Sequence, residues 1–377
     1  MTANLQANGT HASQPTRILV WQWGRNGGAP RFAAQLATGL SRLPNTLVHL
    51  SLAQGAAILQ TKSPPNCDLP IKTYNGLGGF FARVACTPFE IPSLTRRIAA
   101  LQPDFAICAM PGPLDLMMVA ALRRLARSFV VILHDATPHP GDGLPGQMAI
   151  QRIICGQADA VATLSNHVSG QFIARKRATG EHQPLIRLWH PPFDFDFQNT
   201  EKPADGIFRL LMFGRLLRYK GLDLLLAALR LVGPRPDLLV RVVGAGPDSI
   251  ELDDLRGISG VTVENRWVPE DEIGALFGWC DGVILPYQEA SQSGVASIAL
   301  AAGKHIVATR VGGLGEQLAD NPLASLCEPE AGQLAVAIGD LLKPHPPAAI
   351  PTIRKDGWTA MGRSLVDQAV EALNLRH

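Results

Sequence analysis

The chain has 377 residues, of which 46% are hydrophobic and 18% are charged. This length is ample for two α/β domains, and the balance is typical of a packed globular protein rather than a disordered one. The formal net charge is only +2, and no dense block of lysine and arginine accompanies it, so nucleic acid is not expected as a partner.

The chain begins with about sixteen polar residues that lack the apolar core of a signal peptide. No later stretch reaches the roughly 18–20 apolar residues that a membrane-spanning helix needs. The six cysteines contain no Cys-x-x-Cys pair, which argues against a disulfide framework or a zinc site. We therefore expect a cytoplasmic protein, either soluble or placed on the inner surface of a membrane.

The first half of the chain alternates short apolar strands with helices. Residues 17–23 form the first predicted strand, and a glycine-rich turn leads from it into an apolar-periodic helix over 31–43. A second helix is predicted over 114–128. The other strands are predicted at 47–52, 105–110, 129–135 and 160–165. Such alternation predicts parallel strands that are joined by crossover helices.

A break follows between about 184 and 207, where two prolines and a run of polar residues predict an interdomain connection. A second alternation then begins with a strand over 208–214 and a helix over 222–232. Further strands are predicted at 238–244, 261–268, 282–287 and 305–311, and a last helix at 357–375.

The pattern predicts an α/β protein with two Rossmann-like domains, each a parallel sheet flanked by helices. The first domain is expected to span residues 1–195 and the second residues 196–350. Residues 351–377 are expected to form a helix that packs back on the first domain.

The turn after the first strand contains Gly27 and Gly28, with Pro30 and Arg31 opening the helix. Glycines allow close approach of the backbone to a ligand, and a helix N-terminus offers free N–H groups to an anion. A tight turn that needs positive φ explains the same residues equally well.

A stronger signal follows the strand over 208–214. Arg215 and Lys220 lie five residues apart in the loop at the end of that strand. Two cations in such a loop can face one diphosphate, whose departure from a substrate requires stabilisation of its negative charge. A solvated turn whose cations pair with carboxylates is the alternative.

The loop and helix after residue 287 carry a third candidate element. Backbone N–H groups around Ser293, Gly294 and Val295 are expected to point at a phosphate at the start of a helix. Glu289, in the preceding loop, is placed to accept hydrogen bonds from sugar hydroxyls. A helix-capping or surface carboxylate is the plainer interpretation of Glu289.

Several segments together resemble glycosyltransferase family 4, the retaining enzymes of the GT-B architecture. The similar segments are GGAPRFAAQLATGL, DAVATLSNHV, FGRLLRYKGLDLLLAA, VRVVGAGP, PEDEI, CDGVILPY, ALAAGKHIVATRVGGLGE and LAVAIGDLL. The resemblance covers nearly the whole chain and is densest from 208 to 342. It implies two domains facing across a cleft, with the donor in that cleft.

The resemblance also implies roles for particular residues. Arg215 and Lys220 match the cations that hold the donor pyrophosphate, and Gly27 and Gly28 match the glycine turn that faces it across the cleft. The helix start at 293–295 matches the one that faces the phosphate.

Three further residues complete the donor site that the resemblance implies. Trp267 and Val268 match the region that holds the nucleotide base, partly through backbone atoms. His134, at the end of a strand, matches a histidine that faces the donor sugar, and a buried structural histidine is its alternative.

The chain departs from the family pattern in one respect. The family usually carries two glutamates separated by seven residues in this loop and helix. The first would fall at Ala290, but the carboxylate here is Glu289, and the second would fall at Ile298. Isoleucine cannot bond a ribose diol, so ribose recognition has no assigned residue.

No metal site is expected. His134 and His139 lack a third ligand with a supporting spacing, and the sequence Asp194-Phe195-Asp196 falls in the predicted linker. Arg215 and Lys220, with helix N–H groups, would neutralise the diphosphate without a metal. No cofactor is expected besides the nucleotide-diphosphate sugar that serves as donor.

The expected reaction is front-face transfer with retention of configuration to a saccharide or lipid-linked acceptor, in the synthesis of surface polysaccharides. The departing phosphate oxygen takes the acceptor proton, which suits a sequence without an obvious pair of catalytic carboxylates. A nucleotide-sugar epimerase of the same architecture and a non-catalytic sugar-nucleotide binding protein remain the alternatives.

One segment suggests contact with a membrane surface. Residues 79–102 mix phenylalanines with arginines, as an interfacial segment does. A half-buried helix and loop is the competing interpretation, and the sequence favours it slightly.

Overall fold

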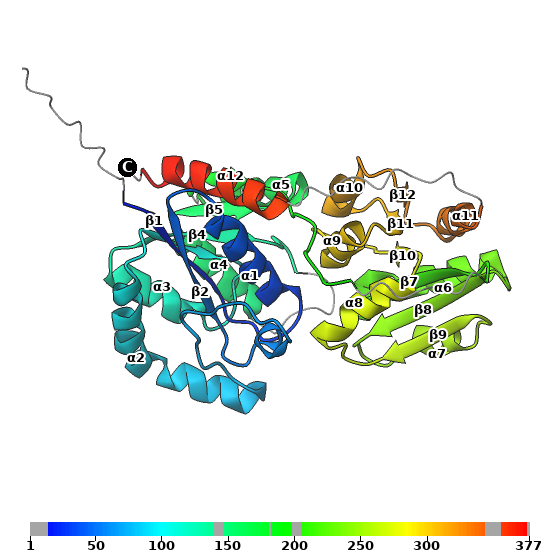
Figure 1. Cartoon of the computed structure of the whole chain (residues 1–377), viewed down its shortest axis with the longest axis horizontal. Helices are drawn as coiled ribbons and strands as arrows, with labels where there is room; N and C mark the ends of the chain where they lie inside the picture. Colours follow the sequence, from blue (N-terminus) through cyan, green and yellow to red (C-terminus); the bar gives the residue numbers. More distant parts are fainter. Residues whose placement is uncertain (1–13, 139–145, 181, 198–204, 344–355, 375–377) are drawn as a thin grey trace, which may run out of the picture.

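A computed structural model of the protein describes residues 14–138, 146–180, 182–197, 205–343 and 356–374. Within these ranges the chain forms two α/β domains, each built on a six-stranded parallel sheet (Figure 1). Helices flank both sheets. The predicted fold class, with two Rossmann-like parallel sheets, is confirmed.

The first sheet has the strand order β2-β1-β3-β4-β5-β6. Its strands are β1 (Thr16–Gln22), β2 (Thr46–Leu52), β3 (Phe105–Cys108), β4 (Ser128–Leu133), β5 (Ala160–Thr163) and β6 (Leu185–Arg187). Its helices are α1 (Gly28–Ser41), η1 (Ala57–Gln60), α2 (Gly76–Leu101), α3 (Asp115–Arg124), α4 (Gln147–Gln157) and α5 (Asn166–Thr179). β3 and β5 are buried along their whole length. Burial on both faces explains why they read as continuous apolar runs.

The second sheet has the strand order β12-β11-β10-β7-β8-β9. Its strands are β7 (Phe208–Phe213), β8 (Leu238–Gly244), β9 (Val261–Asn265), β10 (Gly282–Leu285), β11 (His305–Thr309) and β12 (Ala324–Cys327). Its helices are η2 (Arg218–Lys220), α6 (Leu222–Val232), α7 (Ile250–Arg256), α8 (Glu270–Trp279), α9 (Gly294–Ala301), α10 (Gly312–Leu318) and α11 (Ala331–Leu341). The strand order reverses between β7 and β10, and open α/β sheets bind ligands beyond the carboxyl ends of the strands at such a point.

Some predicted boundaries are wrong. The predicted connection over 184–207 contains β6, and β12 was not predicted at all. Both strands are too short to show a hydrophobic period. The strand predicted over 261–268 ends at Asn265, and α1 begins at Gly28, three residues earlier than predicted.

The last helix, α12 (Gly357–Ala372), lies against α1 of the first domain (Figure 1). The two helices approach closely at Gly39, where a Cβ atom would lie 2.5 Å from the carbonyl oxygen of Trp358. The indole of Trp358 donates a hydrogen bond to the carbonyl of Pro192, which lies in the connector between β6 of the first domain and β7 of the second. The chain therefore returns to the first domain after completing the second.

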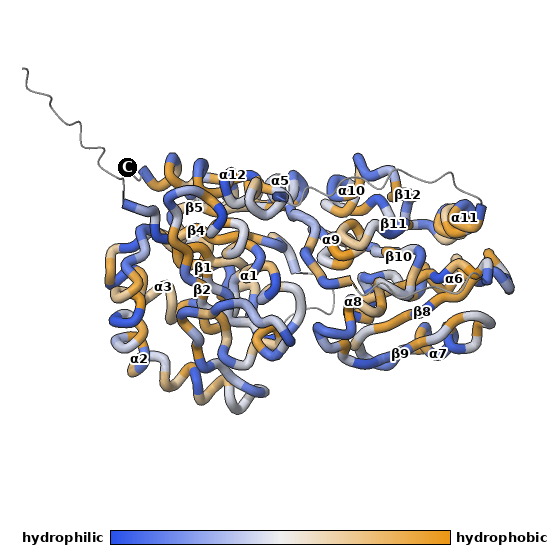
Figure 2. Tube along the Cα trace, in the orientation of Figure 1, coloured by the Kyte–Doolittle hydropathy of each residue, from blue (hydrophilic) through white to orange (hydrophobic). Residues whose placement is uncertain are grey.

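The two domains share a core. One apolar cluster runs from Phe32 of α1 through Phe193 of the connector to Ala296 of α9. Separate clusters fill the other face of each sheet, and the apolar segments line the interior of both domains in Figure 2. The domain junction is thus built like a protein interior.

Polar contacts also join the domains. Arg31 of α1 pairs with Glu270 of α8 at 2.5 Å, and both side chains are largely buried. Glu316 of α10 accepts hydrogen bonds from the backbone N–H groups of Asn166 and His167 at the start of α5, at 2.7 and 2.8 Å. A carboxylate from one domain therefore caps a helix of the other.

The segment predicted as half-buried helix or interfacial segment, residues 79–102, forms most of α2. Pro88 and Pro92 lie inside this helix, and Figure 1 shows it bending between its two halves. Interior prolines remove backbone hydrogen bonds and bend helices. Among the described residues, no helix combines the length and the apolar character needed to cross a bilayer.

Candidate functional site

The loop after β7 carries the two predicted cations beside the start of α9. Gly214 has a φ of +119°, and a Cβ atom there would lie 3.3 Å from Cγ2 of Val295. Arg215 is exposed and donates a hydrogen bond from Nη2 to the hydroxyl of Tyr219 at 3.1 Å. Lys220 ends the short helix η2 five residues later. The close approach at Gly214 brings the cationic loop against the helix that follows β10.

Tyr287, which the sequence did not single out, joins these groups. The Nζ atom of Lys220 lies 3.7 Å from the centre of the Tyr287 ring. The Tyr287 hydroxyl lies 3.3 Å from Oγ of Ser293, the residue before α9. Burial raises the pKa of Tyr287 to about 12, although a hydrogen bond with Ser293 and the Arg215 charge oppose this effect. Tyr287 is therefore neutral at physiological pH, and its ring orients Lys220 by a cation–π contact.

Ser293 is the N-cap of α9. Its Oγ accepts a hydrogen bond from the backbone N–H of Ala296 at 3.1 Å. Its own N–H donates to Oε1 of Gln317 at 2.8 Å, so the Ser293 amide, which was expected to point at a phosphate, is already bonded within the protein. Gly294 and Val295 begin the helix, where backbone N–H groups have no acceptor within the helix. Gly294 and Val295 thus carry the amides at this helix start that lack an acceptor within the helix.

Replacing Ser293 with alanine is expected to lower the free energy of unfolding by about 0.5–2 kcal/mol, because the cap of α9 is lost. Urea denaturation of the two proteins measures the difference. Ser249→Ala is the matched control, since Ser249 precedes α7 in the same position but its side chain forms no cap hydrogen bond. Equal losses in the two variants would show that the Ser293 cap contributes nothing specific.

The glycine turn of the first domain faces the same region. Gly27, with a φ of +81°, is the N-cap of α1, and Gly28 is its first residue. Cβ atoms on Gly28 and Gly294 would lie 3.8 and 3.3 Å from the ring of one residue, Phe193. The N-termini of α1 and α9 therefore approach the same aromatic ring from opposite domains.

His134 lies after β4 at the domain junction and is buried. Its Nε2 lies 2.8 Å from the carbonyl oxygen of Ala109, and its Nδ1 contacts the side-chain amide of Gln292 from the second domain. Burial lowers the pKa of His134, so the ring is neutral, with Nε2–H donating to Ala109 and Nδ1 accepting from Gln292. Gln292 occupies the ring nitrogen that a sugar hydroxyl would need. His139 lies outside the described residues.

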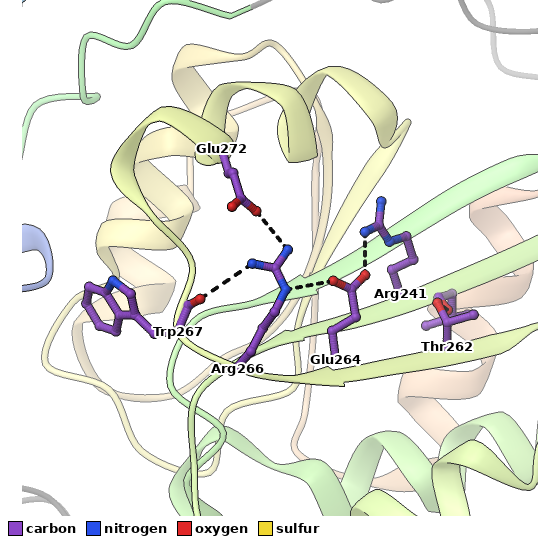
Figure 3. A network of polar contacts seen from close by, with 7 residues as sticks. Arg241, Thr262, Glu264, Arg266, Trp267 and Glu272 are labelled. Carbon is purple, nitrogen blue, oxygen red and sulfur yellow. Dashed lines mark hydrogen bonds and ion pairs between the residues drawn. The ribbon is translucent and has the colours of Figure 1, made fainter. Parts of the chain in front are cut away.

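The region expected to hold the base follows β9 (Figure 3). Val268 is buried, whereas the indole of Trp267 is 48% exposed. Arg266 donates to the carbonyl oxygen of Trp267 at 3.4 Å and is itself held by Glu264 and Glu272, at 3.0 and 2.8 Å (Figure 3). This ion-pair network supports the backbone of the segment, and an exposed indole offers a flat apolar surface.

Glu289, the carboxylate one residue before the family's first glutamate position, and Ile298, at the second position, differ in their surroundings. Glu289 lies exposed in the loop between β10 and α9. Ile298 is buried on α9 and belongs to the apolar cluster shared by the domains. The structure therefore brings Ile298 into the core rather than toward a ribose.

Two family models match the chain. Residues 26–197 match the model described as Glycosyltransferase Family 4, and residues 207–344 match the one described as Glycosyl transferases group 1. Together they cover both domains. The chain belongs to glycosyltransferase family 4.

Curated relatives match this family 4 protein over part of their length. D-inositol 3-phosphate glycosyltransferases of Corynebacterium urealyticum and Arthrobacter sp. are each 34% identical to it, over 217 and 146 residues. These matches cover 51% and 37% of this chain and 51% and 34% of the relatives. The chain thus spans about half or less of the length of the curated relatives it matches.

Solved structures of the GT-B fold resemble the family 4 protein over nearly its whole length. A glycosyltransferase from Rickettsia africae has a TM-score of 0.65 at 16% identity, covering 96% of this chain and all of that one. Anabaena HepE, solved with UDP and glucose, has a TM-score of 0.63 at 18% identity, covering 95% and 99%. Identities this low support the fold alone.

The described residues of this family 4 protein contain no cluster of three or more His, Cys, Asp or Glu side chains arranged to hold a metal. The backbone carbonyl of Asp194 accepts a hydrogen bond from Gln35 at 2.5 Å, so the Asp-Phe-Asp sequence lies against α1. This contact has a structural role in the connector.

A hollow of about 560 Å³ lies at the other end of the second sheet, lined by Phe208, Asp281 and His305, among others. These residues stand at or just before the amino ends of β7, β10 and β11. Ligands of open α/β sheets bind at the carboxyl ends, so this hollow is not the donor site.

His190, which belongs to no motif in the sequence, joins the connector to α9. Its Nδ1 lies 2.7 Å from the carbonyl oxygen of Pro191 and 2.9 Å from Oγ of Ser297. Burial lowers its pKa from 6.5 to about 3. The imidazole is therefore neutral in the folded protein at physiological pH.

This shift predicts acid sensitivity. Between about pH 6.5 and 3 the unfolded chain binds one more proton than the folded chain at His190, so stability falls as the pH falls. This residue alone is expected to remove about 1.4 kcal/mol per pH unit. Urea denaturation from pH 7 to pH 5 should show a shallower loss in His190→Asn than in the unsubstituted chain and in His182→Asn, which replaces an exposed histidine. Equal slopes in all three proteins would contradict the assignment.

Proposed function

We propose that the chain is a retaining, metal-independent glycosyltransferase. It would transfer a hexose-type sugar from a nucleotide-diphosphate sugar to a saccharide or lipid-linked acceptor, in surface polysaccharide synthesis. The observation that carries this proposal is the convergence of two cations and two helix N-termini, one from each domain. The names of the curated relatives, and the UDP and glucose bound to HepE, support a nucleotide-sugar donor.

The diphosphate would lie between the domains. Arg215 and Lys220 would neutralise its charge, with the amides of Gly294 and Val295 donating hydrogen bonds to a phosphate. The turn at Gly27 would face it from the first domain. A diphosphate whose charge is neutralised in this way would require no metal ion, and the reaction would need no cofactor besides the donor.

The base and the sugar of the donor would extend in two directions from the diphosphate. The base would lie against Trp267 and the backbone of Val268, where the exposed indole offers a stacking surface. The sugar would lie near His134 and Glu289. His134 would hold Gln292 and the loop before α9 in place rather than bond the sugar, because its Nε2 donates to Ala109 and its Nδ1 accepts from Gln292.

The transfer itself would proceed on one face of the sugar. The bond between the anomeric carbon and the phosphate oxygen breaks as the acceptor oxygen forms its new bond on the same face. The departing phosphate oxygen accepts the acceptor proton, so no protein base is required. Exclusion of water by the two domains would limit hydrolysis of the donor.

Thermal denaturation with UDP, GDP and ADP sugars tests the donor class, because a ligand that binds the folded state raises Tm. The donor that binds is then incubated with glycan and lipid-linked acceptors, and the anomeric configuration of the product is read by NMR. A retained configuration, with unchanged rate in EDTA, supports the proposal. Conversion of the donor to an epimer without acceptor, or binding without turnover, would support the two alternatives.

We also propose a cytoplasmic site of action at the inner face of a membrane, where a lipid-linked acceptor would be met. None of the six cysteines, all of which lie in the described residues, forms a disulfide, and thiols in this state suit a reducing compartment.

A further inference from the structure

Helix α2 exposes an apolar surface. The side chains of Phe81, Ala85, Pro88 and Pro92 follow one another at helical spacing and are exposed, with Phe89 beside them. Phe81 is 67% exposed and Phe89 is 84% exposed. We call these five residues the outer face of α2. The helix runs along the lower edge of the first domain in Figure 1.

The opposite side of the helix is already used for packing. Leu94 and Ile98 are buried in the apolar cluster on this side of the first sheet, and Phe80 and Ile91 pack against that cluster. A helix that is apolar on both sides is expected to be covered on both. The outer face of α2 therefore requires a second apolar partner.

The outer face carries no charge. Between residues 76 and 92 the only charged side chains are Arg83 and Glu90. These two form an ion pair with each other, and the Arg83 side chain is largely buried. The pair lies two turns apart on the side of the helix away from the outer face. Nothing charged would have to be buried if that face were covered.

Cations gather at the C-terminal half of α2, beyond the outer face. Residues 57–101 contain five lysines and arginines but only two acidic residues, a net charge of +3, whereas the rest of the chain has a net charge of −1. Lys72, Arg96 and Arg97 are exposed. Arg97 donates a hydrogen bond to the carbonyl of Pro70 at 3.1 Å, so the segment before α2 lies beside its C-terminal half.

We propose that the outer face of α2 docks on an anionic lipid bilayer. Phe81 and Phe89 would enter the boundary between headgroups and acyl chains, and Lys72, Arg96 and Arg97 would approach lipid phosphates. A second copy of this chain is disfavoured as the partner, since two segments of net charge +3 would face each other. The inference deepens the proposed function, because it identifies the surface that brings the first domain to a lipid-linked acceptor.

Co-sedimentation of the full chain with vesicles tests the proposal. Binding is expected to vesicles that contain phosphatidylglycerol and to weaken in high salt, with little binding to pure phosphatidylcholine. The double variant Phe81→Ser/Phe89→Ser is expected to bind about tenfold or more weakly, since two apolar side chains no longer enter the bilayer. The matched control, Ile250→Ser/Val336→Ser, removes two residues that are 73% and 64% exposed on the second domain, and should bind like the unsubstituted chain.

Two outcomes would overturn the inference. One is equal vesicle binding by the α2 variant and its control. The other is a dimer, measured by light scattering, that Phe81→Ser/Phe89→Ser dissociates while vesicle binding is absent. The thermal shift with nucleotide sugars is measured on every variant. A normal shift without vesicle binding would contradict the docking surface alone, and vesicle binding without any shift would contradict the donor proposal alone.

Discussion

Replacement of Arg215 with alanine is expected to lower kcat/KM for sugar transfer by about 10²- to 10³-fold, the range for loss of one donor to a developing anion. Lys220→Ala is expected to have an effect of the same order. Both side chains extend from the loop after β7, and both are held by tyrosine contacts close to the start of α9. The leaving diphosphate gains charge at the transition state, so the loss should appear mainly in kcat.

Arg218→Ala is the matched control for this experiment. Arg218 lies in the same loop, is exposed, and follows Arg215 by three residues. Initial rates at saturating and limiting donor separate kcat from KM for each variant. If Arg215→Ala transfers sugar as fast as Arg218→Ala, the diphosphate does not lie at this loop.

Replacement of Gly221 with alanine is expected to lower the free energy of unfolding by about 4 kcal/mol or more, a loss in the range of severe backbone overlap. A Cβ atom at Gly221 would lie 1.7 Å from the carbonyl oxygen of Pro286, and the residue has a φ of +75°. The backbone of the Lys220 loop would have to move away from the segment that leads to Tyr287. The cation–π contact of Lys220 would be lost with it.

Gly180→Ala separates this overlap from the cost of the left-handed conformation. Gly180 has a φ of +70° at the end of α5, and no atom lies within 4 Å of the position of a Cβ. The control is expected to lose about 1–2 kcal/mol, the cost of a left-handed residue with a Cβ atom. Urea denaturation followed by circular dichroism measures both losses. Similar losses would show that the approach to Pro286 can relax at little cost.

The location of the candidate site follows from the topology. β7 and β10 are neighbours in the sheet, where Gly282 pairs with Leu210 although the two residues are 72 positions apart. Their carboxyl ends deliver Arg215 and the loop before α9 to one place. The glycine turn after β1 comes from a different domain, and the ring of Phe193 shows how closely it approaches α9.

Much of the fold could be predicted from the sequence. The predicted bounds of α6 and β8 agree with the structure, because the amphipathic period of α6 and the apolar run of β8, interrupted only by Arg241, are recorded locally along the chain. The short strands β6 and β12 were not predicted. Each pairs with a neighbouring strand, β5 or β11, and has too few residues to show a hydrophobic pattern of its own. The cations Arg215 and Lys220 could be singled out because both lie in one strand-end loop.

Local patterns suffice to predict the two α/β domains, the strand-end cations and the small-residue start of α9, since each depends on residues within a few positions of one another. Three contacts emerge only in the folded chain: the Ser293 amide bonds Gln317, Gln292 reaches His134, and one phenylalanine lies between two helix starts. These contacts join residues that are 24 to 158 positions apart in the two hydrogen-bonded cases. No local pattern records such pairs, because only the packing of the two sheets and the connector brings them within reach.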